Sequence, residues 1–253
     1  MAGWLDGLLD GWLAERTVEL MRTVAFVSFK GGAGKSTAAM ALASSLLASG
    51  RHVTMIDADE NTPLLAWREK AREAELWSDA CEVVRGDDMR SLQAAFTAAT
   101  DRGSDVAIVD TRGGGSELNN AIVGNVDIVI VPTALTGLDI ASALSTFEYA
   151  VRLVHDARLR TPVVLLVQRV PVGRLTVSQS QDLEALSTLP RCKPVLHARD
   201  AFASISKRGM LHLLLERTLA NPRERLTAGH LATAMGEADA VRADIERRME
   251  GAA

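Results

Sequence analysis

The feature that most constrains this chain is a glycine-rich string, Lys30–Thr37 (KGGAGKST), placed between an apolar run and a helical stretch. The preceding run, Thr23–Ser28 (TVAFVS), has the apolar, β-branched character of a buried strand. The following stretch, Ser36–Ala48, is rich in the helix formers alanine and leucine. Glycines let backbone N–H groups converge on one point, and a helix start adds its positive dipole end. The order strand, glycine-rich loop, helix therefore predicts a site for phosphate oxygens.

Each polar residue of the string has an expected task. Lys35 should reach the β- and γ-phosphates of a nucleotide, the Ser36 hydroxyl should ligate Mg²⁺, and Thr37 should hydrogen-bond a phosphate. The backbone amides expected to surround the phosphates belong to Gly31, Gly32, Ala33 and Gly34. The common phosphate-loop pattern has a further glycine where this chain has Phe29, so the string is a variant of that pattern.

Short apolar runs alternate with helical patterns along most of the chain. Strands are expected at Thr23–Ser28, His52–Asp57, Cys81–Arg85, Asp105–Asp110, Val126–Val131, Pro162–Gln168 and Pro194–His197. Helices are expected at Ser36–Ala48, Thr62–Leu76, Asp88–Ala99, Ile140–His155, Val177–Ser187, Asp200–Lys207 and, as one or two helices, Pro222–Met249. This alternation predicts an α/β fold with a doubly wound, mostly parallel sheet flanked by helices. No linker or repeat interrupts residues 21–253, so we expect one domain there.

Residues 1–20 do not fit the alternation and are treated as an amphipathic N-terminal extension. Their apolar side chains fall on one helical stripe made by Trp4, Leu5, Leu8, Leu9, Trp12 and Leu13. The segment could pack on its own domain, lie upstream of a true start at Met21, or contact a second protein. Four acidic residues against one arginine disfavour a membrane surface, because anionic lipids would repel them.

Composition and charge narrow the location and the partners. Cys81 and Cys192 stand far apart and outside any CxxC pair, which favours reduced thiols in a cytoplasmic protein. No apolar run approaches the roughly 18–20 residues that span a bilayer. The formal net charge is −4, but residues 1–150 carry 12 basic and 21 acidic side chains, whereas residues 151–225 carry 13 and 6. The chain is acidic on average, yet residues 151–225 are basic. This basic segment could bind DNA or could be a solvated face.

Carboxylates follow two of the expected strands. Asp57 and Asp59 (DAD) lie at the end of one strand, and Asp110 ends another. Because parallel strands present their carboxyl ends at one edge of a sheet, these side chains should lie beside the phosphate loop. There they could hold Mg²⁺ through its waters or orient an attacking water, or act only as turn and helix caps.

Lys30, just before the glycine pair, resembles the signature lysine of the ParA/MinD family of deviant Walker ATPases, P-loop NTPases of the SIMIBI class. The resemblance implies that Lys30 crosses a dimer interface to the nucleotide of the other subunit, so that ATP binding drives homodimerisation. It further implies Asp59 as the water-activating residue in the switch I loop, Asp57 as support for the metal shell, and Asp110 as the Walker B acid. The switch II loop that senses the γ-phosphate would then include Thr111, Arg112 and Gly113. A solvated Lys30 without such a role is the alternative.

Five strings together look like one branch of that family, the VirC-type ATPase of conjugative and T-DNA transfer. They are Ser28–Thr37 (SFKGGAGKST), Asp57–Asn61 (DADEN), Asp110–Asn120 (DTRGGGSELNN), Arg169–Leu175 (RVPVGRL) and Arg199–Leu213 (RDAFASISKRGMLHL). The similarity covers about Met21 to Met249. Two departures from partition ATPases stand out: Glu60-Asn61 replaces Pro-Gln, and Gln168 stands where an asparagine often contacts the base.

The resemblance implies a slow, Mg²⁺-dependent ATPase that binds ATP, dimerises, and contacts DNA mainly through its phosphates. It would recruit a relaxase–DNA complex to a secretion channel, in the cytoplasm and at the cell pole. The candidate DNA contacts are Arg174, Lys207 and Arg208. A plasmid or chromosome partition ATPase and a nucleotide-gated scaffold with negligible turnover are the alternatives. A metallochaperone of the same fold is disfavoured, because the chain lacks the cysteine pair or histidine-rich tract that such a protein needs.

Overall fold

The computed structural model describes residues 21–251, so the extension expected at residues 1–20 lies outside the described residues. Within residues 21–251, no helix is both long and apolar enough to cross a membrane. Cys81 and Cys192 are both buried free thiols.

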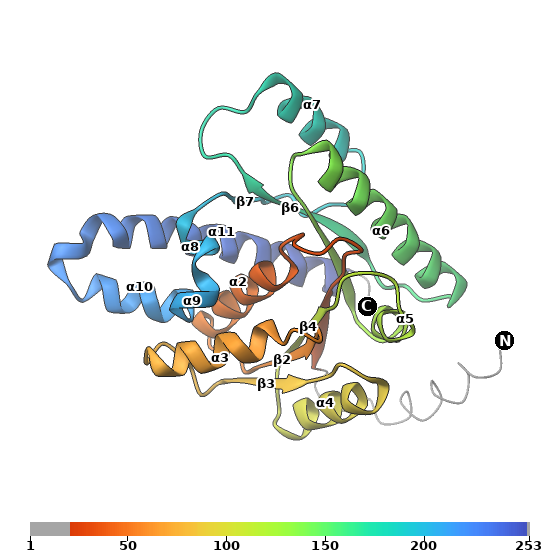
Figure 1. Ribbon diagram of the computed structural model, residues 1–253, viewed down its shortest axis with the longest axis horizontal. Coiled ribbons are helices and arrows are strands. Elements are labelled where there is room, and N and C mark those ends of the chain that lie inside the picture. The colour runs from red at the N-terminus through yellow and green to blue at the C-terminus, as the bar shows by residue number, and fades with distance from the viewer. Residues whose placement is uncertain (1–20, 252–253) are drawn as a thin grey trace.

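In this described part of the chain, seven parallel strands form one sheet in the order β3-β2-β4-β1-β5-β6-β7 (Figure 1). Their bounds are β1 Arg22–Phe26, β2 Val53–Ala58, β3 Cys81–Arg85, β4 Val106–Thr111, β5 Ile128–Thr133, β6 Val163–Val170 and β7 Leu196–His197. The chain winds outward from β1 to β3, returns to β4, and then passes β1 to continue on its other side. The loop after β1 therefore lies where the winding changes direction, which is where open α/β sheets bind ligands. The predicted fold class is confirmed.

Helices cover both faces of the sheet (Figure 1). One face carries α2 Lys35–Ala48, α3 Pro63–Glu73, α8 Asp200–Ala203, α9 Ile205–Arg208, α10 Leu211–Leu219 and α11 Arg225–Glu250, which follows the 3-10 turn Pro222–Glu224. The other carries α4 Met89–Asp101, α5 Glu117–Gly124, α6 Gly137–Asp156 and α7 Val177–Leu186. Alternate residues of β1 and the residue after it enter the two cores: Val24 and Phe26 face α2, whereas Ala25 and Val27 face the opposite layer.

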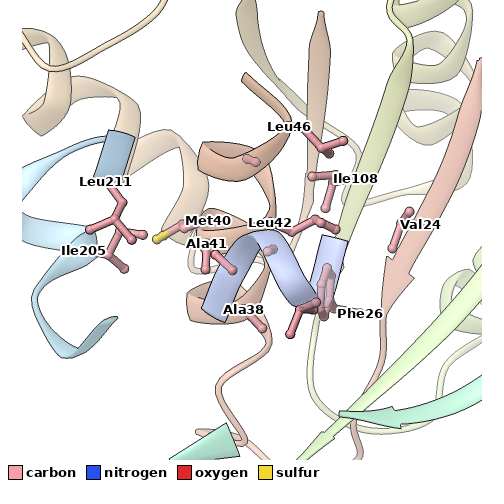
Figure 2. Packing of buried hydrophobic residues seen from close by; sticks show 14 of the residues in the cluster. Val24, Phe26, Ala38, Met40, Ala41, Leu42, Leu46, Ile108, Ile205 and Leu211 are labelled. Atoms are coloured by element: carbon pink, nitrogen blue, oxygen red, sulfur yellow. The ribbon is translucent and has the colours of Figure 1, made fainter. Parts of the chain in front are cut away.

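Helix α2, which starts at the phosphate loop, is buried on almost every side (Figure 2). Its Leu42 and Leu46 lie toward the sheet, while Met40 points toward Ile205 of α9 and Leu211 of α10. A helix enclosed in this way needs no polar face, which explains the nearly uniform apolar sequence AAMALASSLLA. The phosphate loop is thereby anchored to a helix that is buried over most of its length.

Two helices, α5 and α10, were not expected from the sequence. Helix α5 has only eight residues, and its N-cap is Ser116, whose hydroxyl accepts from the Asn119 N–H. Helix α10 has no side-chain cap of its own. Instead the Ser44 hydroxyl, on α2, accepts from the Leu211 N–H at 3.1 Å across a separation of 167 residues. Such a distant cap leaves no local start pattern for the sequence to reveal.

The single helix expected at Asp200–Lys207 is two short helices, α8 and α9. Ser204 interrupts them with φ −103° and ψ −2°, and its hydroxyl donates back to the Asp200 carbonyl at 2.7 Å. This local bond competes with a continuous helical ladder. The long C-terminal helix was expected and is present as α11.

Candidate nucleotide-binding site

A cavity of about 570 Å³ opens at the carboxyl edge of the sheet, above β1. It is lined by the phosphate loop, the loop after β2, the loop after β4, and one residue of β6. The lining residues are Gly31, Gly32, Gly34, Lys35, Ser36, Thr37, Asp59, Glu60, Asn61, Arg112, Gly113, Gly115 and Arg169. The structure therefore gathers most of the residues predicted for nucleotide binding into one cleft.

The phosphate loop has the backbone form that its glycines permit. Gly32 and Gly34 adopt φ values of 76° and 87°, in the left-handed region that disfavours side chains. Gly34 is the N-cap of α2, so the helix dipole begins at the cleft. The Lys35 side chain is buried, with 6% relative exposure, while Ser36 and Thr37 line the cleft. A lysine placed at a helix start beside free N–H groups suits a phosphate chain.

Gln168, at the end of β6, lies against the phosphate loop. Its Nε2 donates to the Ala33 carbonyl, and a Cβ added at Gly34 would collide with that nitrogen. Gln168 is 2% exposed and does not line the cleft. The side chain predicted to contact the nucleotide thus supports the loop from behind, and Gly34 is required because of that close approach.

Asp110, the last carboxylate of β4, is buried with 1% exposure, and neither of its oxygens has a hydrogen-bond partner among the described residues. Its pKa is raised to about 7, mainly by burial and also by the charges of Asp57 and Asp59, although the nearby Ser36 hydroxyl and Lys35 act to lower it. The Ser36 hydroxyl is close enough to act on the pKa without reaching hydrogen-bond geometry. A buried carboxylate without donors is costly unless a cation or water meets it.

Asp57 and Asp59 lie side by side in sequence but have different surroundings. The Asp57 Oδ2 accepts from the N–H groups of Leu64 and Leu65 at 2.8 and 3.0 Å, which caps α3 from the neighbouring strand. Burial nevertheless raises the Asp57 pKa, because those bonds only partly offset the loss of water. Asp59 lines the cleft, and its Oδ1 accepts from the backbone and side chain of Asn61, both at 2.9 Å.

An ion pair links the loops after β2 and β4 across the mouth of the cleft. The Arg112 Nη1 lies 2.5 Å from the Glu60 Oε1, and the Glu60 side chain is 70% exposed. Both residues line the cavity. The sequence singled out Arg112 as part of switch II and Glu60 as a departure from partition ATPases, but it did not predict that they pair.

The rest of the loop after β4 is fixed by hydrogen bonds. Thr111 is fully buried and donates to the Phe26 carbonyl at 2.9 Å. The Asn119 amide, at the start of α5, donates to the Gly114 carbonyl at 2.7 Å and to the Arg112 carbonyl at 3.3 Å. Gly113 lies so close to the phosphate loop that a Cβ added to it would be 3.4 Å from the Gly31 amide nitrogen. The phosphate loop and the predicted switch II loop are therefore in contact.

Lys30 is outside the lining of the cleft. Its Nζ lies 2.5 Å from the Asp139 Oδ1, at the start of α6, and its side chain is 42% exposed. The hydrogen bond from Lys30 lowers the Asp139 pKa, as does the Thr136 hydroxyl. In one subunit the lysine therefore points away from its own nucleotide cleft.

Arg169 is a cleft residue that the sequence did not assign to the nucleotide. Its Nη2 donates to the Gly32 carbonyl at 2.9 Å, and its φ is 54°. A charged residue near the end of the largely apolar run PVVLLVQRV was the one available sign of it.

The predicted DNA contacts do not form one patch in a single subunit. Arg174 follows β6, whereas Lys207 and Arg208 belong to α9, and Figure 1 places these segments well apart. All three residues are exposed. Arg208 lies 3.5 Å from Asp200.

The residues in and beside the cleft fit a magnesium nucleotide. The Ser36 hydroxyl in the lining and the unpartnered oxygens of the nearby Asp110 are hard oxygen donors, and the glycines of the phosphate loop leave room for phosphates. No group of three or more His, Cys, Asp or Glu within residues 21–251 could hold a metal by itself. This suits Mg²⁺, which keeps several waters and is usually held by one or two protein ligands plus phosphate oxygens.

Solved structures with this fold define the class. A putative plasmid partition protein of Borrelia burgdorferi bound to AMPPNP superposes with TM-score 0.63 at 15% identity, covering 90% of this chain and 99% of that one. The MinD cell division protein of Aquifex aeolicus gives 0.55 at 16%, covering 85% and 97%. The cobyrinic acid a,c-diamide synthase of Mycobacterium smegmatis, with an ATP analog and magnesium bound, gives 0.58 at 17%, covering 83% and 97%. The fold is that of the ParA/MinD-type P-loop NTPases.

The chain belongs to the VirC1 protein family, whose pattern matches residues 21–251. The virC1 protein of Rhizobium radiobacter is 45% identical over 230 residues, which cover 91% of this chain and all of that protein. The virC1 protein of Rhizobium rhizogenes is 46% identical over 217 residues, covering 86% and 94%. A ParA protein of Rhizobium radiobacter is 31% identical over 119 residues, covering 47% and 51%.

Proposed function

We propose that this protein is an ATP-dependent, dimerising, DNA-binding ATPase that brings a relaxase–DNA complex to the secretion channel in conjugative or T-DNA transfer. The observation that carries the proposal is one cleft lined by the phosphate loop with Lys35 and Ser36, beside which the buried Asp110 has no hydrogen-bond partner among the described residues. Membership of the VirC1 family supports the role in transfer, and the ATP and magnesium ligands of the fold neighbours support those cofactors.

The residues divide the chemistry between them. Lys35 and the loop amides hold the β- and γ-phosphates and offset charge that develops on them. Ser36 and Asp110 would hold a Mg²⁺ ion, Ser36 through its hydroxyl and Asp110 through its carboxylate, and a bound Mg²⁺ would supply positive charge for the phosphate oxygens. Asp59, on the open side of the cleft, orients the attacking water. Two hydrogen bonds from Asn61 already occupy the Oδ1 of Asp59. We therefore expect Asp59 to orient the water slowly, because that oxygen is engaged.

Dimerisation would give Lys30 its task. The lysine is exposed and lies outside its own cleft, and among residues 21–251 its Nζ pairs with the partly exposed Asp139 alone. A second subunit facing the cleft could therefore receive it at the γ-phosphate. The dimer would carry two copies each of Arg174, Lys207 and Arg208. These residues would contact DNA phosphates with little sequence preference. The expected location is the cytoplasm, at the cell pole where the channel is assembled.

A DNA-retention experiment tests the proposal. Wild type with ATP and Mg²⁺ should shift a duplex, and the shift should weaken with rising salt because phosphate contacts release counterions. ADP and the Lys35→Ala variant should abolish it. Lys70→Ala, at an exposed position of α3, is the matched control and should behave as wild type. An ATP-dependent shift that survives Lys35→Ala would contradict the proposal.

Partition is the second candidate, and the ParA similarity favours it. The chemistry would be the same and the partner would differ. Incubation of the ATP-bound protein with a relaxase from the same replicon, and separately with its centromere-binding protein, distinguishes the two. Binding to the relaxase supports transfer.

A nucleotide-gated scaffold with negligible turnover is the third possibility. In that case ATP would still drive dimerisation, but phosphate release would stay at background with DNA and partner present. The Asp59→Ala variant is the reference for background: a wild-type rate above it supports an ATPase, and an equal rate supports the scaffold.

A further inference from the structure

We infer that Arg169 is a nucleotide-contacting residue, whose guanidinium binds the phosphate chain of the nucleotide held by its own subunit. The inference rests on the proposed function, because it needs a nucleotide in the cleft. It adds a cation that none of the sequence motifs assigned to that task.

Arg169 lines the cleft in a strained backbone conformation. Strand β6 is buried except at Arg169, where the pairing with β7 shifts register between Gln168 and Val170. Arg169 has φ 54°, in the left-handed region that a residue with a Cβ adopts only under constraint. At this irregularity in the pairing of β6 with β7, the Arg169 side chain lies toward the phosphate loop, where it bonds Gly32. Bulges re-aim side chains in this way beside active sites.

The side chain is held at one corner and leaves other donors free. Its Nη2 donates to the Gly32 carbonyl at 2.9 Å. A guanidinium has five N–H donors in a planar fork, so this single bond fixes its direction without using its capacity. Among the described residues no carboxylate lies within 4 Å of Arg169, in contrast to Arg112, which is paired with Glu60. An anion in the cleft would therefore meet an oriented and unpaired cation.

The position of Arg169 beside the phosphate loop favours a contact with the phosphate chain of the nucleotide. Gly32 belongs to the first half of the phosphate loop, and Arg169 lines the same cavity as Lys35 and Ser36. Lys30 is turned away to Asp139, so within one subunit Arg169 supplies positive charge on that side of the loop. Lys30, Thr136 and, to a smaller degree, the charge of Arg169 lower the pKa of Asp139. Bidentate binding of a phosphate group matches this geometry.

A purely structural role, tying β6 to the loop, makes a different prediction. Glycine accepts φ 54° without strain, so Arg169→Gly removes the guanidinium and keeps the backbone. The matched control is Arg158→Gly, because Arg158 is an exposed arginine with φ 56° at the end of α6, outside the cleft. Both substitutions relieve the same backbone conformation, and only one removes the cleft cation.

The experiment measures the dissociation constants of ATP, ADP and GTP with Mg²⁺, together with thermal unfolding without nucleotide. Arg169→Gly should weaken all three nucleotides about tenfold, the loss expected for a charged hydrogen bond. Unfolding without nucleotide should stay unchanged or move upward. Arg169→Lys should recover part of the affinity, since a charge without the fork remains. Arg158→Gly should bind as wild type.

Three outcomes would overturn the inference: unchanged affinity in Arg169→Gly, an equal loss in Arg158→Gly, or a loss for ATP with none for GTP, which would indicate a contact to the base. The Lys35→Ala variant separates this from the proposed function. If the Lys35→Ala variant still binds ATP with wild-type affinity, the cleft is not the nucleotide-binding site, and the proposed function fails together with the inference.

Discussion

The Lys30 Nζ lies 2.5 Å from the Asp139 Oδ1, so the lysine that precedes the phosphate loop is bound to the first turn of α6. In that position it cannot reach a nucleotide in its own cleft. Use of Lys30 by a second subunit therefore requires this ion pair to break.

Asp139→Asn should favour the ATP-dependent dimer. A partly exposed ion pair contributes about 0.2–1 kcal/mol, and one such pair breaks in each subunit of the dimer, so the dimer association constant should rise by about two- to thirtyfold. Sedimentation or light scattering across a concentration series with ATP measures it. Glu148→Gln, which removes an exposed pair with Arg152 on the same helix, is the control. A weaker dimer in Asp139→Asn would show that Asp139 serves the interface itself.

Glu60→Gln should speed exchange of nucleotide. The Glu60–Arg112 pair spans the mouth of the cleft, and its loss lets the two loops separate more easily. Because the pair is exposed, we expect an increase in the release rate of about two- to fivefold, less at high salt. Stopped-flow release of a fluorescent ATP analogue measures it. Glu69→Gln on α3 should release nucleotide as wild type does, and an unchanged rate in Glu60→Gln would contradict the bridging role.

Asp57→Ala should destabilise the protein without nucleotide or Mg²⁺. Its Oδ2 accepts two N–H groups at the start of α3, and leaving buried donors unpaired costs about 1–3 kcal/mol. Asp57→Asn retains an acceptor oxygen and should lose less. Urea unfolding in EDTA gives both values. If stability falls only when Mg²⁺ and nucleotide are present, the carboxylate acts through the metal and not as a cap.

Asp110 should make stability depend on pH in the empty protein. Its folded pKa, about 7, is above its ordinary value of 3.8, so the folded state retains a proton that the unfolded state releases. Stability should therefore decrease as pH rises from about 4 to about 7, and Asp110→Asn should remove that decrease. At pH 8 the variant should be at least about 1 kcal/mol more stable without Mg²⁺. Wild type and Asp110→Asn with the same pH profile would contradict this assignment.

The sequence predicted the sheet, the phosphate loop and the strand-end carboxylates because each depends on local pattern. β-branched runs identify buried strands, and the order of residues in Lys30–Thr37 leaves few alternatives. Cys81–Arg85, expected as a shorter strand, is β3 with those same bounds. The order of the strands in the sheet could not be predicted from the sequence, because it depends on which helices pack on which face of the sheet.

What the sequence missed depends on long-range contacts. The start of α10 needs Ser44, and the direction of Arg169 needs a bulge against β7. The placement of Gln168 behind the loop follows from its contact with Ala33 and Gly34. Glu60 and Arg112, 52 residues apart, become partners only because β2 and β4 are neighbours.

The molar mass in solution with ATP, with ADP and without nucleotide, each with Mg²⁺, tests most directly whether ATP drives dimerisation. We expect a dimer only with ATP, its loss in both Lys30→Ala and Lys35→Ala, and retention of duplex DNA by that dimer. A monomer under all conditions, or a dimer that does not depend on nucleotide, would contradict it.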